Sequence, residues 1–209
     1  MYAVISRDTI QLPPGTVVRM PGTWQDYQTL CHSRGNSSIP RVKYRSGEIL
    51  LMSPMPRHGR EASLLADIVK ALLDSVGRNY EAFTPITMEL PETSGIEPDY
   101  CFYIDNWAAA VGKDRIRWDA EPPPDLVIEI DITSYTAVED YAAYQVPEVW
   151  LYQRGQLQLF ALTAGGYQLT STSRYFPDVA LAEVVADTLQ VAATQGSGAA
   201  IQALRQRLP

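Results

Sequence analysis

The run DLVIEID, residues 125–131, constrains the fold more than any other segment of the chain. Its aliphatic residues predict a strand buried on both faces, because a half-exposed strand alternates apolar and polar residues. Alternate side chains of a strand share a face, so Glu129 and Asp131 would point the same way from this apolar element. Acids near a core persist only when they are paired, hydrogen-bonded or bound to a metal ion. The segment therefore predicts a buried strand that carries a polar site.

Counter-charges for these acids are scarce in the neighbouring sequence. No Lys or Arg occurs between Arg117 and Arg154. We infer that a divalent ion is the simplest partner, and oxygen ligands favour a hard ion, Mg²⁺ or Mn²⁺. The alternative is that Glu129 lies on an exposed edge strand and is solvated.

Asp99 is a second candidate metal ligand. It follows Pro98 at the start of an extended run, and the segment between Asp99 and Glu129 is long enough for a strand, a crossover and the next strand. The two carboxylates would then lie at neighbouring strand ends, which is an arrangement suited to metal-assisted phosphodiester hydrolysis. A strand-starting role without metal ligation is the alternative for Asp99.

The pattern of the whole chain predicts a mixed α/β fold, in which helices flank a largely buried sheet. Apolar spacing and end signals predict helices at 23–35, 59–76, 134–146, 179–190 and 199–208. Ser46-Gly47 and Arg154-Gly155 predict two hairpin turns. We expect one domain over residues 1–209, with a short helical tail from about 178 to 209.

The composition limits the classes of function. The net charge of −7 counts against general affinity for nucleic acids, which depends on Lys and Arg, although basic residues are denser around RVKYR at 41–45. The two isolated cysteines, Cys31 and Cys101, exclude a disulfide scaffold and favour a reducing cytoplasm. No apolar run reaches the length of a membrane-spanning helix, so we expect no membrane partner.

Four segments of the chain occur in a recognisable order and spacing: SGEILLMSPMPRH, EPDYCFYI, PPPDLVIEIDITS and YAAYQVPEVWLY. Together they resemble the Uma-two family of putative restriction endonucleases, which belongs to the PD-(D/E)XK nuclease superfamily and is numerous in cyanobacteria. The likeness runs from about Lys43 to Tyr152. The resemblance implies a restriction-endonuclease-like fold, with a mixed β-sheet flanked by helices. It also implies a divalent metal and cleavage of DNA by an activated water.

The resemblance also implies roles for individual residues. Asp99 corresponds to the acid of the PD half-motif and Glu129 to the acid of the (D/E)XK half, so both would bind the metal. Glu48 and His58 match the acid and the histidine of the family's early segment, where they would complete the metal shell or orient water. An exposed hairpin Glu and a His at a helix start are the alternatives.

The lysine of the superfamily motif is missing. Asp131 stands two residues after Glu129, and Ala137 stands where many family members carry the lysine on the following helix. A substitute cation must come from elsewhere in the chain, and the candidates are Lys43, Arg45, Arg57 and Lys113.

Three functions remain open at this point. The leading hypothesis is a Mg²⁺-dependent DNA endonuclease, expected as a homodimer because two cuts across a duplex suit twofold symmetry. The second is a degenerate nuclease-fold protein, without the lysine, that binds DNA or protein. The third is a metal-dependent hydrolase with a substrate other than DNA, which the acidic net charge favours.

Overall fold

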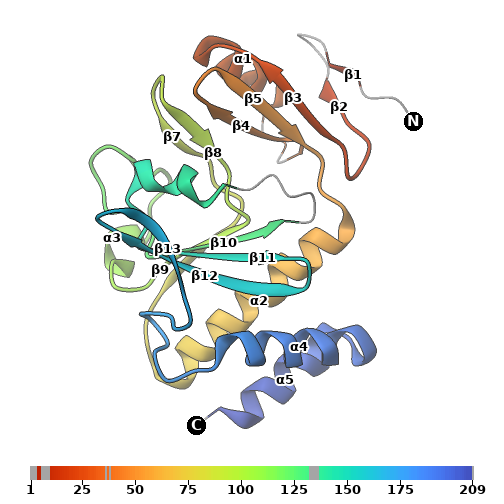
Figure 1. The fold of residues 1–209 in the computed structure, drawn as a ribbon, viewed down its shortest axis with the longest axis vertical. Coiled ribbons are helices and arrows are strands. Elements are labelled where there is room, and N and C mark those ends of the chain that lie inside the picture. The colour runs from red at the N-terminus through yellow and green to blue at the C-terminus, as the bar shows by residue number, and fades with distance from the viewer. Residues whose placement is uncertain (1–3, 6–9, 36, 38, 132–136, 209) are drawn as a thin grey trace.

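A computed structural model of the chain describes residues 4–5, 10–35, 37, 39–131 and 137–208. Three parts are stacked along the long axis in Figure 1: a β-sheet with its helix at the top, a second sheet in the middle, and a helical layer at the bottom. The mixed α+β architecture, with sheets flanked by helices, is the predicted fold class.

The central sheet has six strands and holds the apolar strand that the sequence singled out. Its order is β13 (Gly166–Thr170), β12 (Gln156–Thr163), β11 (Glu148–Gln153), β10 (Leu126–Asp131), β9 (Tyr100–Tyr103) and β6 (Glu81–Phe83). β10 pairs in parallel with β11 and antiparallel with β9. Every residue of β10 is buried, so the predicted burial on both faces is confirmed and the edge-strand alternative is wrong.

The antiparallel pairing of β9 with β10 corrects one sequence-based expectation. A crossover connection was expected between Asp99 and Glu129, but the chain passes through α3 (Trp107–Ala110) and returns antiparallel. Tyr100 pairs with Ile128, so Asp99 and Glu129 each stand one residue beyond that last pair of the ladder. The two acids are therefore on neighbouring strands by a different route from the one predicted.

A second sheet of five strands was not anticipated. Its order is β3 (Val17–Pro21), β5 (Glu48–Met52), β4 (Arg41–Arg45), β8 (Ser94–Ile96) and β7 (Met88–Leu90), and a separate pair, β1 (Val4–Ile5) and β2 (Ile10–Gln11), lies beside it (Figure 1). The predicted hairpin supplies β4 and β5, and the turn residues Ser46 and Gly47 both have positive φ, as a two-residue hairpin turn requires. Helix α1 (Trp24–Arg34) packs against one face of this sheet, where Tyr27, Val42 and Leu51 share a core.

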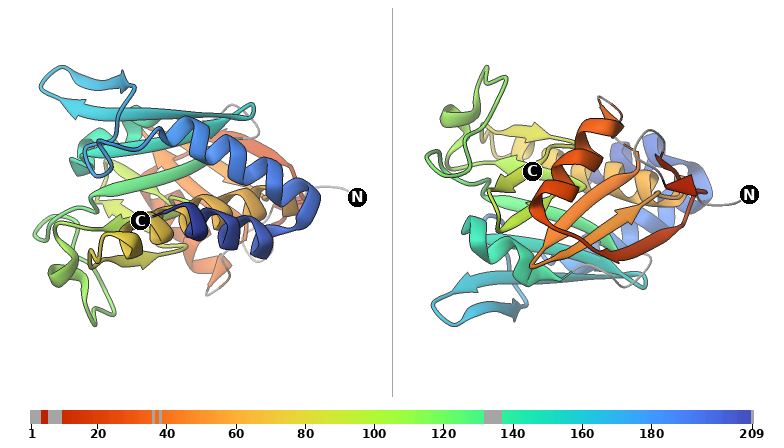
Figure 2. Two further views of the ribbon diagram at one scale, coloured as in Figure 1. Left: turned by 90° about the horizontal axis from the view of Figure 1, so that it is seen from below. Right: turned by 90° about the horizontal axis from the view of Figure 1, so that it is seen from above.

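Helices form the third layer of the molecule. The long helix α2 (Pro56–Ser75) starts three residues before its predicted start and contributes Leu65, Ile68 and Leu72 to the main core. Figure 2 shows α4 (Leu181–Gln195) and α5 (Ser197–Arg207) running beside α2. Leu181 and Leu204 belong to the same core, so the predicted helical tail is packed against α2 and the central sheet.

The helix predicted at 134–146 takes a different form in its described part. Residues 134–136 lie outside the described residues, and Val138–Tyr144 form a 3₁₀ helix, η1. Val138, Tyr141 and Tyr144 are the buried residues of η1, and their spacing of three matches the 3₁₀ repeat. The predicted α-helical period would instead place Ala142 and Gln145 on the same face as Val138 and Tyr141.

Candidate active site

Glu129 is the centre of the candidate site. It lies in the middle of the all-buried strand β10, with 2% of its surface exposed. Its Oε1 accepts hydrogen bonds from Lys43 Nζ at 2.8 Å and from the hydroxyl of Tyr141 at 2.5 Å. Lys43 comes from β4 of the second sheet and Tyr141 from η1, so both long-range partners reach the same oxygen.

Asp99 lies directly before β9 and is equally buried, at 1% exposure. Its Oδ2 accepts from the backbone N–H of Ile130 at 2.7 Å, which ties it to the residue after Glu129. Its Oδ1 accepts from His58 Nε2 at 2.6 Å and forms an ion pair with the guanidinium of Arg41. Two acids on adjacent strands are thus held together by partners from three other elements.

Strand β4 carries a row of three cations, two of which pair with these acids. Arg41, Lys43 and Arg45 alternate with the buried residues Val42 and Tyr44, so all three point to the face away from α1. In order along the strand they pair with Asp99, Glu129 and Asp140. The site therefore lies where the cationic face of one sheet meets the acids of the other.

The pKa values of the two acids are shifted in opposite directions. Burial raises the pKa of Asp99, but the charge of Arg41 and the hydrogen bond from His58 outweigh it and hold that pKa below the ordinary value. Burial raises the pKa of Glu129, and Lys43 only partly offsets this because the neighbouring charge of Asp99 raises it further. Opposed shifts in one pair of carboxylates are typical of functional sites.

The two partners of Glu129 also have perturbed pKa values. Burial alone would lower the pKa of Lys43, but the charge of Glu129 outweighs that effect and the pKa lies above its usual value. Burial and the adjacent Glu129 raise the pKa of the Tyr141 hydroxyl well above 10.0. At neutral pH Lys43 is a fixed cation and Tyr141 a fixed hydrogen-bond donor.

The structure separates the four candidates for the missing lysine. Lys43 contacts Glu129, and Arg45 instead pairs with Asp140. Arg57 pairs with Glu61 in its own helix, and Lys113 with Glu121 in a distant loop. Of the candidates, Lys43 alone forms an ion pair with either site acid among the described residues.

Glu48 and His58, which match the acid and the histidine of the family's early segment, lie in different parts of the structure. His58 lies in the first turn of α2 and contacts Asp99 directly. Glu48 is exposed beside the hairpin turn, and its carboxylate lies 3.9 Å from Arg19 Nε, with no contact to Asp99 or Glu129. The structure thus brings three of the four predicted site residues together and leaves Glu48 outside.

Sequence reasoning missed Arg41, Tyr141 and Asp140. The alternation in RVKYR, with Val42 and Tyr44 between cations, was the available signal for a cationic strand face. Asp131 shares the face of Glu129 as expected, and its Oδ2 accepts from Gln153 Nε2 at 3.0 Å, at the far end of the strand.

The donor set fits a Mg²⁺ ion only as a site with two protein ligands. Among the described residues there is no group of three or more His, Cys, Asp or Glu side chains with metal-binding geometry. Mg²⁺ commonly binds through one or two carboxylates and keeps waters or phosphate oxygens as its other ligands. Asp99 and Glu129 meet that requirement, although each already carries a side-chain cation.

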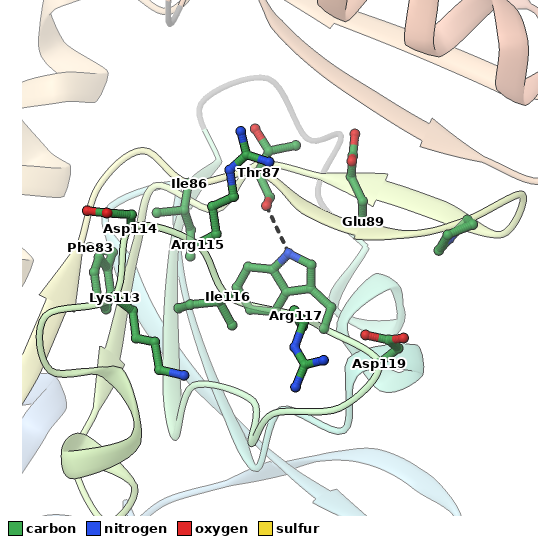
Figure 3. A pocket seen from close by; sticks show the side chains of 12 residues that line it. Phe83, Ile86, Thr87, Glu89, Lys113, Asp114, Arg115, Ile116, Arg117 and Asp119 are labelled. Atoms are coloured by element: carbon green, nitrogen blue, oxygen red, sulfur yellow. Dashed lines mark hydrogen bonds between the residues drawn. The ribbon is translucent and has the colours of Figure 1, made fainter.

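A separate cavity of about 540 Å³ lies beside Phe83, the last residue of β6, and Glu89 of β7 (Figure 3). Phe83, Ile86 and Trp118 line it together with Arg115 and Arg117, and the Trp118 indole donates to the carbonyl of Thr87 at 3.1 Å. Neither Asp99 nor Glu129 lines this cavity, so it is distinct from the acid pair.

The sequence profile of the Uma2 family, described as "Putative restriction endonuclease", matches residues 24–194. The chain belongs to the Uma2 family. Its match covers α1, the central sheet, four of the five strands of the second sheet and nearly all of α4, and so includes every residue of the candidate site.

A solved structure supports the fold of this Uma2 protein. The crystal structure of a putative nuclease belonging to DUF820 from Anabaena variabilis aligns with a TM-score of 0.50 and 14% sequence identity. The alignment covers 78% of this chain and 92% of the other. No curated protein matches the chain. Within the described part of the chain, no helix combines the length and apolar character needed to span a bilayer.

Proposed function

We propose that the protein is a Mg²⁺-dependent DNA endonuclease that hydrolyses phosphodiester bonds, with Mn²⁺ as an alternative ion. The supporting observation is that Lys43 contacts Glu129 while Asp99 is hydrogen-bonded to the adjacent residue Ile130, in a chain of a family described as putative restriction endonucleases. Two acids and a lysine are the chemical components of the superfamily motif, although here the lysine comes from a different strand.

In this proposal Asp99 and Glu129 hold the ion. A bound divalent ion would supply a lowered pKa for a water nucleophile and compensation for phosphate charge. His58 holds Asp99 through Oδ1, and the peptide N–H of Ile130 holds it through Oδ2, so the carboxylate plane is fixed. Tyr141 fixes Glu129 in the same way.

Lys43 takes the place of the motif lysine, which is absent at Ala137. Its raised pKa keeps it protonated at neutral pH, so it acts as a positive charge and hydrogen-bond donor rather than as a base. Next to Glu129 it can steady the attacking water and the negative charge that develops on the phosphate oxygens. We place the reaction in the cytoplasm and in a homodimer, in which two sites can cut both strands.

The direct test is the nicking of supercoiled plasmid by purified protein with Mn²⁺ or Mg²⁺. We expect activity in the wild type and a loss of about 100-fold or more in Lys43→Met and Glu129→Gln. Lys70→Met is the matched control, because Lys70 pairs with Asp67 on α2 and should leave the rate unchanged. An equal rate in wild type and Lys43→Met would refute the role of Lys43.

The second candidate function is a degenerate member that binds DNA or protein without cutting. The observation that favours it is that both acids already carry cations from β4. Filter binding of a labelled duplex, with and without Mn²⁺, separates the two functions. Binding that is independent of metal, with intact plasmid at every pH and salt concentration, would favour this second function.

A further inference from the structure

We propose that Arg41 is a built-in counter-ion of Asp99 that a divalent ion must displace before the site is loaded. This proposal rests on the proposed function, because it concerns the same acid pair. It assigns a role to a residue that lies outside the acid and lysine positions of the nuclease motif.

The coordination of Asp99 provides the first argument. A carboxylate oxygen accepts along about two lone-pair directions. Oδ1 already has two partners, His58 and Arg41, and Oδ2 has the N–H of Ile130. Three of the about four acceptor directions of Asp99 are therefore occupied, and an ion that binds Oδ1 requires one of its two partners to leave.

The balance of charge provides the second argument. The acids Asp99 and Glu129 are matched by the cations Arg41 and Lys43, and all four side chains are at most 14% exposed. A divalent ion added to this set would leave an excess of two positive charges in a buried place, where charge repulsion is strong. Release of Arg41 removes one of those charges.

Arg41 is better placed to leave than Lys43. Its Nη1 also donates to the backbone carbonyl of Glu97 at 3.4 Å, which offers the guanidinium a second acceptor. Asp99 keeps His58 as a partner after Arg41 moves. Among the described residues Lys43 donates to Glu129, so its release would cost the ammonium that hydrogen bond.

Calorimetric titration with Mn²⁺ tests this competition without any activity assay. We expect Arg41→Met to bind Mn²⁺ about tenfold more tightly than the wild type, because the competing charge is gone. Arg45→Met is the matched control, since Arg45 lies on the same strand face but pairs with Asp140, and its affinity should equal that of the wild type. Circular dichroism confirms that each variant is folded.

A measurement on the wild-type chain covers the case in which Arg41→Met does not fold. Mg²⁺ is titrated into ¹⁵N-labelled protein, and the side-chain Nε–H resonance of Arg41, assigned with Arg41→Lys, should shift as the ion binds. Arg45 again serves as the control resonance. A shift confined to Arg41 supports displacement, and a saturating titration that leaves Arg41 unmoved overturns it.

The outcomes separate this proposal from the proposed function. If wild type and Arg41→Met bind Mn²⁺ equally and Glu129→Ala abolishes binding, the metal site stands and the role of Arg41 is wrong. If neither wild type nor Arg41→Met binds Mn²⁺, the metal-dependent function and the displacement both fall.

Discussion

The ammonium of Lys43 donates a 2.8 Å hydrogen bond to the carboxylate of Glu129, although the two residues are 86 positions apart in the chain. The contact joins the cationic face of β4, in the second sheet, to β10 of the central sheet. It also places a cation beside Glu129, the acid of the motif. The position of the motif lysine is occupied by Ala137. A pair of this kind matters for stability as well as for chemistry.

A double-mutant cycle measures that stability. Lys43→Met leaves the buried charge of Glu129 without its cation, so we expect a loss of about 3–5 kcal/mol in the free energy of unfolding. The double variant Lys43→Met/Glu129→Gln should be more stable than Lys43→Met, because no unpaired charge remains. Urea unfolding of the four proteins gives the coupling energy, and additive effects would contradict a direct pair.

Tyr141 should influence the titration of Glu129. Tyr141→Phe removes a donor to the buried carboxylate, so we expect a loss of about 1–3 kcal/mol in stability. The same hydrogen bond lowers the pKa of Glu129, and its removal should move the acidic limb of the pH–rate profile to higher pH.

Tyr144→Phe is the control for this prediction. Its hydroxyl donates to the carbonyls of Met88 and Ser94 instead of to an acid. The control should lower stability and leave the pH profile in place. A shift of the profile in both variants would contradict a specific effect on Glu129.

Protonation of Asp99 should lower the free energy of unfolding at acidic pH. Burial raises its pKa, but Arg41 and His58 hold the folded-state value below the ordinary one, whereas the unfolded chain has a pKa of about 3.9. The stability from ionised Asp99 is therefore fully present above about pH 4 and is lost as the pH falls through the lower folded-state value.

Urea unfolding of wild type and Asp99→Asn over this acidic range checks the prediction. The difference between the two free energies of unfolding should shrink as the pH falls, because the wild type alone loses the charged interaction. A constant difference across the range would be incompatible with a lowered pKa of Asp99.

Glu97, directly after β8, should tie α1 to the second sheet. Its carboxylate pairs with Arg34 of α1 and accepts from the N–H of Val42 and from Thr87. Glu97→Gln leaves the buried guanidinium of Arg34 without its counter-ion, and we expect a loss of about 3–5 kcal/mol. Thermal unfolding measures it, with the exposed Glu48→Gln as a control that should change little.

Local features of the fold could be predicted from the sequence because their causes lie within a few residues. Thr23, the first residue of the helix predicted at 23–35, forms with Asp26 the capping box that starts α1. The turn at Arg154-Gly155 has positive φ at both residues and closes the predicted β11–β12 hairpin. The burial of β10 followed from its own aliphatic residues.

Errors arose where the period or the partner of an element mattered. η1 was predicted as an α-helix because Val138, Tyr141, Ala142 and Gln145 lie at α-helical spacing, whereas its buried residues follow a spacing of three. The five-stranded sheet was missed because β7 and β8 contain only three residues each, and their pairing with β4 links distant parts of the chain.

The acids of the site were visible in the sequence, because a carboxylate within an aliphatic strand is costly in any fold and demands a partner. The identity of that partner was open among four cations until the chain was folded. The register of β4 against β5 and β8 turns Arg41, Lys43 and Arg45 toward the acids, and a slip by one residue would turn Val42 and Tyr44 there instead. Only the tertiary structure could choose Lys43, because opposite charges find each other by position in space and not by distance along the chain.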